Sequence, residues 1–174
     1  MILLVLTLIA LIIFLTVFLI VGITMLIFDL TLDLPFVRTS NKKIETVLKF
    51  ADVKKGQKVV DLGSGDGRLL FSTAKKGAIS IGYELNPFLF LLSKLLSRIN
   101  GLSKNVFIKK ENMWSASLKD ADVIFVFSLK STIKRFEDFV FKNAKKGTKV
   151  VVNMNSFPSK KPQKEENDIF LYIV

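Results

Sequence analysis

Residues 59–68 read Val59-Val60-Asp61-Leu62-Gly63-Ser64-Gly65-Asp66-Gly67-Arg68, and this pattern predicts a short buried strand followed by a glycine-rich turn. The apolar residues of the first half suit a strand that ends on an acid. The three alternate glycines let the backbone turn sharply and approach a ligand closely, because glycine has no Cβ. N–H groups at the start of the next helix would favour an anionic group such as a carboxylate. The turn therefore predicts a ligand-binding loop.

Two acids indicate which ligand would suit this loop. Asp61, near the end of the strand, can accept hydrogen bonds from an ammonium group. Residues 79–84 predict the next strand, and Glu84 lies at its carboxyl end, where open α/β sheets bind ligands. Glu84 could hold both hydroxyls of a ribose there. An amino acid and a ribose occur together in S-adenosylmethionine (SAM), so we expect SAM as the cofactor.

The loop has two other interpretations. The dinucleotide fingerprint G-x-G-x-x-G would require its third glycine at residue 68, where the chain has Arg68. A nicotinamide site also uses an acid such as Glu84, so Glu84 alone does not discriminate between the two cofactors. The glycines could also form a structural turn that binds nothing. The observed spacing G-x-G-x-G favours SAM over both alternatives.

The rest of the chain alternates predicted helices and strands, which is typical of an α/β fold with a parallel sheet. The helix expected over residues 40–51 has apolar residues on one face, and Ser40 is its candidate N-cap. Further helices are expected over residues 66–76, 86–100 and 132–144, and further strands over residues 106–109, 123–127, 149–153 and 169–174.

The helix expected over residues 86–100 is rich in leucine and phenylalanine. Asn86-Pro87 is typical of an N-cap followed by proline at the first helical position. Leu89 and Phe90 lie outside the main apolar stripe, which indicates either additional core burial or membrane contact. The stripe that we expect to be buried consists of Phe88, Leu91, Leu92, Leu95, Leu96 and Ile99.

The amino-terminal residues 2–28 contain no charged side chain. As a helix they would be roughly 40 Å long, enough to cross a hydrocarbon core of ~30 Å. A cleaved signal peptide should begin with basic residues and have a shorter apolar core, whereas the first basic residue here is Arg38. A buried core helix is the other alternative. We expect a transmembrane anchor at residues 1–28, a connector at 29–39 and a globular domain at 40–174.

The distribution of charge predicts an orientation in the membrane. All 26 Lys and Arg follow residue 34, and two of the 15 acidic residues precede it, so the remainder carries 13 acids and a net charge of +13. Because basic flanks stay on the cytoplasmic side, we expect a single-pass protein with its amino terminus outside and its domain in the cytoplasm. The basic surface could also hold the domain against anionic lipid. Nucleic acid is the alternative partner, but the sequence contains no recognised RNA- or DNA-binding motif.

The chain has neither cysteine nor histidine. Disulfides and cysteine-ligated metals are therefore excluded, and the commonest metal ligand and general base is missing. We expect no metal site.

These motifs resemble those of the class I SAM-dependent methyltransferases. Within them the chain resembles the family of ATP synthase c-subunit and adenine nucleotide translocase lysine methyltransferases, together with the small archaeal protein-lysine methyltransferases. The residues that carry this resemblance are Pro35-Phe36-Val37-x-Thr39, Asp61 to Arg68, Gly77-Ala78, Gly82-x-Glu84, Ala121-Asp122-Val123 and Gly147 to Val151. The resemblance implies a Rossmann-like methyltransferase domain at residues 40–174, with a mostly parallel sheet, helices on both faces and an antiparallel last strand. It also implies transfer of methyl groups from SAM to lysine side chains of a protein, here a membrane protein.

The resemblance implies roles for the matched positions. Glu84 would hold the ribose, and Asn112 takes a place where the superfamily commonly has an acid that contacts adenine, with Met113 beside it. Thr39 would help form the cofactor pocket or the acceptor entrance, with helix capping as the alternative. Arg68 would be an ion-pair partner rather than a ligand contact. The methionine part of SAM would be held by Asp61, Gly63, Ser64, Gly65, Asp66 and Gly67.

The sequence defines the acceptor side of the site less well. The end of the predicted fourth strand, residues 125–129, lacks the Asn-Pro-Pro-Tyr type of motif found in enzymes that methylate planar amides or adenine amines. Residues 153–158 depart from the aromatic pattern of the family, which puts the sixth strand and the acceptor channel in doubt. Glu111, Asn112 and Asn153 lie near the right strand ends, but none is assigned as the catalytic base. A lipid headgroup or small amphiphile as acceptor, and SAM binding without catalysis, are the alternative functions.

Overall fold

The computed structural model describes residues 1–31 and 39–174 of the chain. The chain forms two compact units, Met1–Pro35 and Phe36–Val174. The predicted Pro35-Phe36-Val37 element lies outside the described residues.

The first unit contains one helix, α1 (Ile2–Thr31), which ends three residues beyond the predicted anchor. Residues 2–24 have a mean hydropathy of 3.3 and are long and apolar enough to cross a membrane, and none of them is buried. The hydroxyls of Thr7, Thr16 and Thr24 donate to carbonyls three or four residues earlier, so these polar groups are satisfied within the helix, as a hydrocarbon environment requires. Burial does not account for this helix, although a signal sequence near the amino terminus would have the same length and composition.

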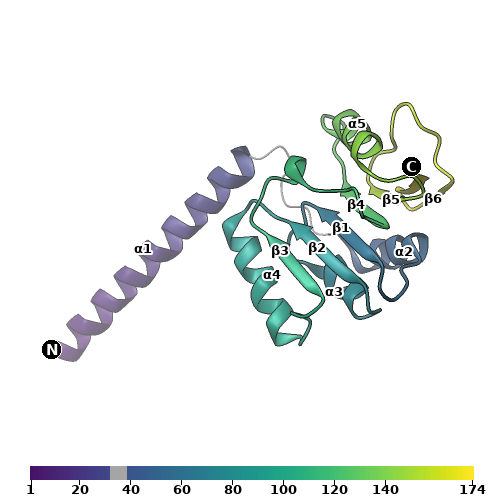
Figure 1. The fold of residues 1–174 in the computed structure, drawn as a ribbon. Coiled ribbons are helices and arrows are strands. Elements are labelled where there is room, and N and C mark those ends of the chain that lie inside the picture. The colour runs from purple at the N-terminus through teal and green to yellow at the C-terminus, as the bar shows by residue number, and fades with distance from the viewer. Residues whose placement is uncertain (32–38) are drawn as a thin grey trace. The chain divides into compact units, whose positions relative to one another are not determined.

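The second unit is built on a seven-stranded sheet with the order β3-β2-β1-β4-β5-β7-β6 (Figure 1). Strands β1 to β5 pair in parallel, and β7 pairs antiparallel with β5 and with β6, which agrees with the predicted sheet. The strands are β1 (Lys58–Leu62), β2 (Ile79–Tyr83), β3 (Val106–Lys109), β4 (Val123–Phe127), β5 (Lys149–Asn153), β6 (Lys164–Glu166) and β7 (Ile169–Ile173). The helices are α2 (Asn41–Ala51), α3 (Arg68–Ala74), α4 (Pro87–Ile99) and α5 (Ile133–Asn143), with a 3-10 turn η1 (Met113–Ser115).

Helices cover both faces of this sheet, as predicted. On one face, Phe50 of α2 belongs to a buried cluster with Val151 of β5. On the other face, the ring of Phe141 in α5 packs against Phe157, which in turn packs against Tyr172 of β7. The central strands are therefore buried from both sides, which explains their nearly continuous apolar sequences.

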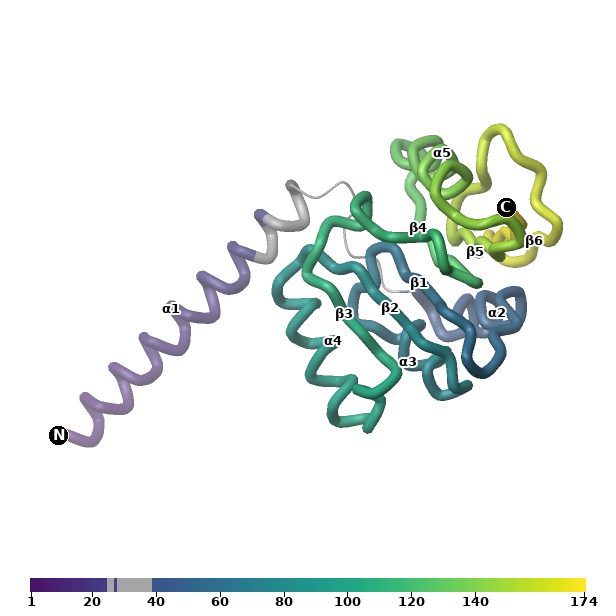
Figure 2. Tube along the Cα trace, in the orientation of Figure 1, coloured from purple at the N-terminus to yellow at the C-terminus, as the bar shows by residue number. Residues whose placement is uncertain are grey.

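The carboxyl-terminal strand is present despite the unusual sequence that precedes it. The strand predicted over residues 169–174 is β7, and Figure 2 shows the chain returning to the sheet after a long loop. The backbone N–H of Phe157 donates to the Tyr172 hydroxyl at 2.8 Å, which ties this loop to the sheet. The short strand β6 was not predicted, because all three of its residues are polar and exposed and show no alternation.

The predicted burial of α4 is wrong. The leucines and isoleucine expected in the core, Leu91, Leu92, Leu95 and Ile99, are 61%, 44%, 54% and 71% exposed. The residues buried on this helix are two serines, Ser93 and Ser97. A Cβ built on Gly67 would lie 3.2 Å from the Ser93 Cβ and 2.7 Å from the ring of Phe71 in α3. Because α4 approaches this glycine so closely, only a small side chain fits at the contact, and the apolar stripe faces outward.

Candidate cofactor-binding site

The glycine loop leaves β1 at the place where the sheet changes its winding direction. Strand β1 lies between β2 and β4, and the crevice beside the carboxyl ends of such strands is where open α/β sheets bind ligands. Gly63, Gly65 and Gly67 have φ angles of 85°, 56° and 83°, a left-handed conformation that glycine adopts without strain. Because Gly67 is left-handed, α3 begins at Arg68, two residues later than predicted.

The N–H groups of this loop already have partners within the protein. Gly63 and Ser64 donate to the Tyr83 carbonyl at 3.0 Å, and Gly67 donates to the Ser64 carbonyl at 2.9 Å. These bonds fix the loop against the end of β2. The expectation of an anionic group concerned the N–H groups at the start of α3, which begins at Arg68, and it stays a prediction.

Asp61 is a buried carboxyl, only 6% exposed, on β1 beside the loop. Burial raises the pKa of Asp61 well above its ordinary value, and the neighbouring negative charges of Glu84 and Asp66 raise it further. A cation beside the carboxylate would relieve both effects, because it would stabilise the charged form. The site therefore favours a positively charged ligand group next to Asp61.

Glu84 follows β2 and connects the glycine loop with the start of α4. One carboxylate oxygen accepts from the Gly65 N–H at 2.8 Å, and the other accepts from the Asn86 N–H at 2.7 Å. A carboxylate is an acceptor with about four positions, which is the chemistry that a pair of hydroxyl donors requires. Glu84 is 7% exposed, and its position is fixed by both backbone contacts.

Arg68 is an ion-pair partner, as expected. Its guanidinium binds both carboxylate oxygens of Asp66, with one contact at 2.5 Å, and this hydrogen bonding raises the pKa of Arg68. The same guanidinium donates to the Thr39 carbonyl at 2.9 Å. The side chain of Asp66 is thus already paired within the protein.

Thr39 lies at the same edge of the sheet rather than at a helix cap. The N-cap of α2 is Ser40, whose hydroxyl accepts from the Lys43 N–H at 3.4 Å. The alternative capping role for Thr39 is therefore wrong. The Thr39 hydroxyl lies 3.4 Å from the side-chain amide nitrogen of Asn153, at the end of β5. The structure brings Thr39 and Asn153 together although 114 residues separate them.

Met113 and its neighbour Asn112 lie beside Gly63 of the glycine loop. A Cβ on Gly63 would lie 3.9 Å from the Met113 sulfur, so Met113 lines the space that the absence of a Cβ opens. The Asn112 side-chain oxygen accepts from the Trp114 N–H at 3.1 Å and so caps η1. The predicted adenine-contacting pair therefore lies next to the predicted methionine-binding loop.

Trp114, the only tryptophan of the chain, was not predicted from the sequence as a residue near the site. Its indole packs on Phe136 with centroids 4.5 Å apart, and the guanidinium carbon of Arg135 lies 3.9 Å from its ring centre. Trp114 thus joins η1 to α5 directly beside Met113. The signal that could have found it is its position in the sequence, directly after the predicted binding residue Met113.

Two buried polar atoms at this edge have no hydrogen-bond partner among the residues that the structure describes. They are the Ser64 hydroxyl and the side-chain oxygen of Asn153. Ser64 packs over Gly82, because a Cβ there would lie 2.5 Å from its hydroxyl oxygen. Buried polar atoms normally find a partner, and Asn153 lies beside Thr39, so its side-chain oxygen marks this side of the site as a place for a ligand donor.

These residues fit SAM by the chemistry of their donors and acceptors. Asp61 suits an ammonium group, Glu84 suits a diol, and Met113 offers an apolar contact for a base. No group of acids that could hold a metal ion is found within residues 1–31 and 39–174, the described part of the chain.

Comparison with known proteins identifies the family of this chain. The model of the ANTKMT methyltransferase domain family matches residues 61–164. Adenine nucleotide translocase lysine N-methyltransferase of Mus musculus is 34% identical over 134 residues, which cover 76% of this chain and 58% of the relative. The lysine N-methyltransferase of the ATP synthase c-subunit from Homo sapiens is 30% identical over 125 residues, which cover 72% of this chain and 53% of the relative. The chain therefore spans between half and three fifths of the length of these two relatives.

A shorter relative and a solved structure cover more of the domain. A protein-lysine N-methyltransferase of Saccharolobus islandicus is 31% identical over 121 residues, which cover 67% of this chain and 74% of the relative. The crystal structure of an RNA methyltransferase from Salinibacter ruber in complex with S-adenosyl-L-homocysteine superimposes with a TM-score of 0.75. It is 23% identical and covers 79% of this chain and 93% of that chain, so it shows the fold, which is that of the class I methyltransferases.

Proposed function

Because this chain belongs to the family of the ANTKMT methyltransferase domain, we propose that it is a membrane-anchored, SAM-dependent methyltransferase that modifies lysine side chains of a membrane protein. The match of the family model across residues 61–164 carries this proposal. The names of the relatives from Mus musculus, Homo sapiens and Saccharolobus islandicus all describe lysine methyltransferases. The geometry of Asp61, Glu84 and Met113 around the glycine loop supports the same cofactor.

Each element of the loop edge has a role in holding SAM. Asp61 pairs with the ammonium group, and the loop from Gly63 to Gly67 lies against the methionine part. Glu84 accepts hydrogen bonds from the ribose hydroxyls. Asn112 and Met113 contact the adenine, and Thr39 lies on the acceptor side. Asp66 and Ser64 shape the loop through the ion pair with Arg68 and the packing on Gly82.

SAM supplies an electrophilic methyl group on a sulfonium, and the protein has to present a neutral amine in line with it. A lysine with an ordinary pKa of about 10.4 is neutral in only roughly one molecule in two thousand at pH 7. Desolvation lowers the pKa of an amine. The unpaired oxygen of Asn153 and the hydroxyl of Thr39 are placed to accept hydrogen bonds from that amine, which would orient it for transfer.

The proposal includes a membrane anchor and an orientation of the chain in the membrane. Helix α1 crosses the bilayer, and the basic domain stays on the cytoplasmic side. An anchored enzyme meets membrane proteins at a high local concentration, because tethering makes the encounter effectively intramolecular.

Methyl-labelled SAM tests this function directly. The full chain, reconstituted into vesicles, is incubated with membranes from a source that lacks it, and the label is followed after lipid extraction. We expect the label in protein, recovered as methylated lysine after hydrolysis, and none with Asp61→Ala. Label in the lipid phase would instead show a lipid or amphiphile acceptor, and SAM binding without any transfer would contradict the enzymatic proposal.

A further inference from the structure

The outward apolar face of α4 requires a partner in addition to the domain itself. At helical spacing, Leu91, Leu95 and Ile99 lie on the side opposite the buried Ser93 and Ser97. Surface helices of globular proteins ordinarily turn their apolar stripe toward the core. A contiguous apolar surface of this kind marks an interaction site.

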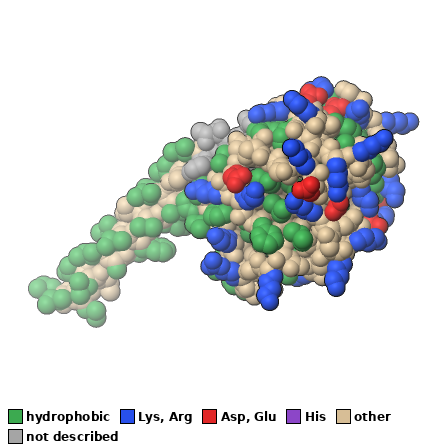
Figure 3. All heavy atoms as spheres, viewed as in Figure 1, with side chains coloured by type: hydrophobic (Ala, Val, Ile, Leu, Met, Phe, Trp, Pro, Cys, Tyr) green, Lys and Arg blue, Asp and Glu red, His purple; other side chains and the backbone are tan. Residues whose placement is uncertain are grey.

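The charge around this face identifies the partner. Residues 85–110 contain five basic residues and no acid. Lys94 and Arg98 lie on α4 beside the apolar stripe, and both are exposed. Figure 3 shows Lys and Arg side chains spread over the viewed face of the domain, with few Asp and Glu among them. An apolar face with a basic border is the signature of a helix that lies in the interface of an anionic bilayer.

We propose that α4 is a membrane-docking helix, whose stripe of Leu91, Leu92, Leu95 and Ile99 enters the interfacial region of an anionic leaflet while Lys94 and Arg98 contact its phosphates. This inference rests on the proposed anchoring by α1, because the anchor keeps the domain at the bilayer and a modest affinity then suffices.

The position of α4 connects this docking to the candidate site. Its N-cap Asn86 donates its backbone N–H to Glu84, the proposed ribose ligand, at 2.7 Å. The apolar stripe therefore begins at the edge of the sheet that carries the site. Docking along α4 keeps this edge close to the membrane surface, where a lysine at the end of a membrane-spanning segment would be found.

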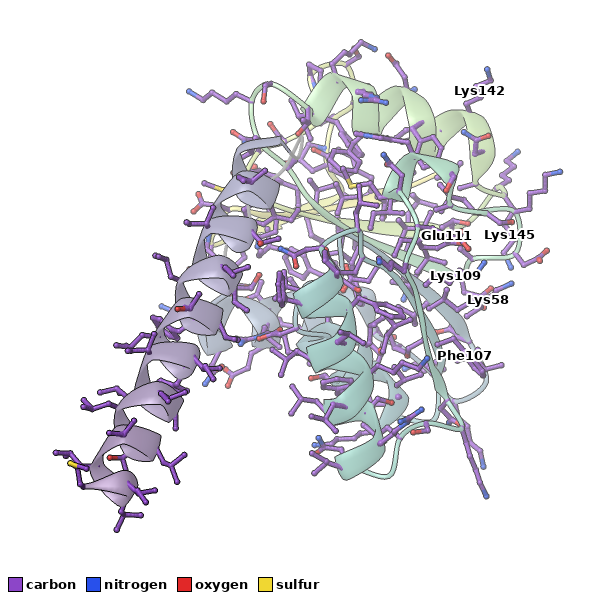
Figure 4. The ribbon with its side chains drawn as sticks, turned by 90° about the vertical axis from the view of Figure 1, so that its left-hand side faces the viewer. Lys58, Phe107, Lys109, Glu111, Lys142 and Lys145 are labelled. Carbon is purple, nitrogen blue, oxygen red and sulfur yellow. The ribbon has the colours of Figure 1, made fainter. Side chains whose placement is uncertain are left out.

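The opposite face of the sheet provides an internal control. Phe107 of β3 is 49% exposed, and Figure 4 shows it projecting on the other side of the strands from α4. Because Val106 packs in the cluster with Leu70 of α3, its neighbour Phe107 must point to the opposite face. A bilayer that contacts α4 cannot contact Phe107 at the same time.

Site-specific fluorescent labelling tests this docking. The chain has no cysteine, so a single introduced cysteine is the only labelling site. Leu95→Cys, Phe107→Cys and Leu15→Cys variants of the full chain carry an environment-sensitive fluorophore in vesicles of equimolar phosphatidylcholine and phosphatidylglycerol. Nitroxide-labelled lipid quenches only fluorophores that contact the bilayer. We expect quenching at residues 15 and 95 and none at residue 107.

A charge variant tests the basic border of the same face. Lys94→Gln with Arg98→Gln should shift the docking equilibrium about 25-fold, since each basic group near an anionic leaflet contributes about fivefold. Quenching at residue 95 should fall in this variant, and quenching at residue 15 should stay unchanged.

Several outcomes would overturn the inference. Quenching at residue 15 without quenching at residue 95 would leave the anchor intact and refute docking by α4. Equal quenching at residues 95 and 107 would show unspecific contact. Oxidative crosslinking of two Leu95→Cys chains, with residue 95 protected from the lipid quencher, would identify a second copy as the partner. Absence of quenching at residue 15 would refute the anchor and with it this inference. The proposed methyl transfer is measured by the labelling experiment above and could fail or succeed independently of docking.

Discussion

Asp61 is the residue at which stability and function oppose each other. Its pKa is raised by burial and by the charges of Glu84 and Asp66, so the folded protein binds a proton more tightly there than the unfolded chain does. Stability contributed by this group is therefore present at low pH and is lost as the pH rises from the unfolded pKa through the folded one. An acid in this state is typical of a binding site rather than of a structural core.

Replacement of Asp61 by asparagine should therefore stabilise the protein at pH 7 while it prevents SAM binding. We expect a higher free energy of unfolding at pH 7, because asparagine removes the cost of ionising a buried carboxyl, and no gain at a pH below both pKa values. Thermal unfolding across pH measures this difference. Asp120→Asn, at an exposed position, should change stability by less than about 0.5 kcal/mol, and an equal effect of both variants would contradict the assignment.

Gly82 allows the loop to lie against β2. A Cβ there would be 2.5 Å from Leu70 Cδ1 and from the Ser64 hydroxyl oxygen. Gly82→Ala should destabilise the domain by roughly 1–3 kcal/mol, the usual effect of overpacking a core. Denaturant unfolding followed by circular dichroism measures this loss. Gly22→Ala in α1 has nothing within 4 Å of its new Cβ and should leave the transition of the domain unchanged, whereas an unaltered midpoint for Gly82→Ala would show that the loop has another position.

At the scale of the elements, η1 is the part of the site whose environment should report on the ligand. Trp114 lies next to Met113 and packs on Phe136 and Arg135. Adenine bound against Met113 would change the emission of this single tryptophan. Titration with S-adenosylhomocysteine should therefore alter the fluorescence with the same midpoint that calorimetry gives, and Asp61→Ala should abolish the change. Binding detected by heat with no change in emission would place the adenine elsewhere.

The elements also show which features a sequence can predict. The strands β1 to β5 and β7 could be predicted, because each is a short apolar run bounded by glycine or polar residues. Strands that are buried on both faces of a parallel sheet have such nearly continuous apolar sequences. The sequence showed that α4 has an apolar face, but it did not show that this face turns toward solvent instead of the core. Periodicity places residues on a common face, whereas the choice between core and solvent depended on the close contact of Ser93 with Gly67, which exists only in the folded chain.

The candidate site, like the fold, could be predicted from the sequence only in part. The glycine loop and the two acids are local signals with a direct chemical meaning. The contact between Thr39 and Asn153 joins the two ends of the domain, and neither residue alone indicates it. The position of Trp114 against α5 likewise depends on the packing of a helix that follows it by about twenty residues in the sequence.

At the scale of the whole molecule, the chain combines an apolar helix, a strongly basic domain and a cofactor site at one edge of its sheet. The basic residues are partly engaged in surface ion pairs, such as Lys145 with Asp122 and Lys43 with Asp168, and such exposed pairs contribute little to stability. The proposed docking of the domain on an anionic membrane surface would give this excess of basic residues a role.

The central claim is that the glycine loop with Asp61 and Glu84 binds SAM. Titration calorimetry of the full chain in detergent with S-adenosylhomocysteine tests it most directly, with NADH as the competing ligand. We predict binding of one molecule per chain, no heat with NADH, and loss of binding in Gly65→Val and Asp61→Ala with an intact circular dichroism spectrum. Binding of NADH in place of S-adenosylhomocysteine, or unchanged affinity in both variants, would contradict the account.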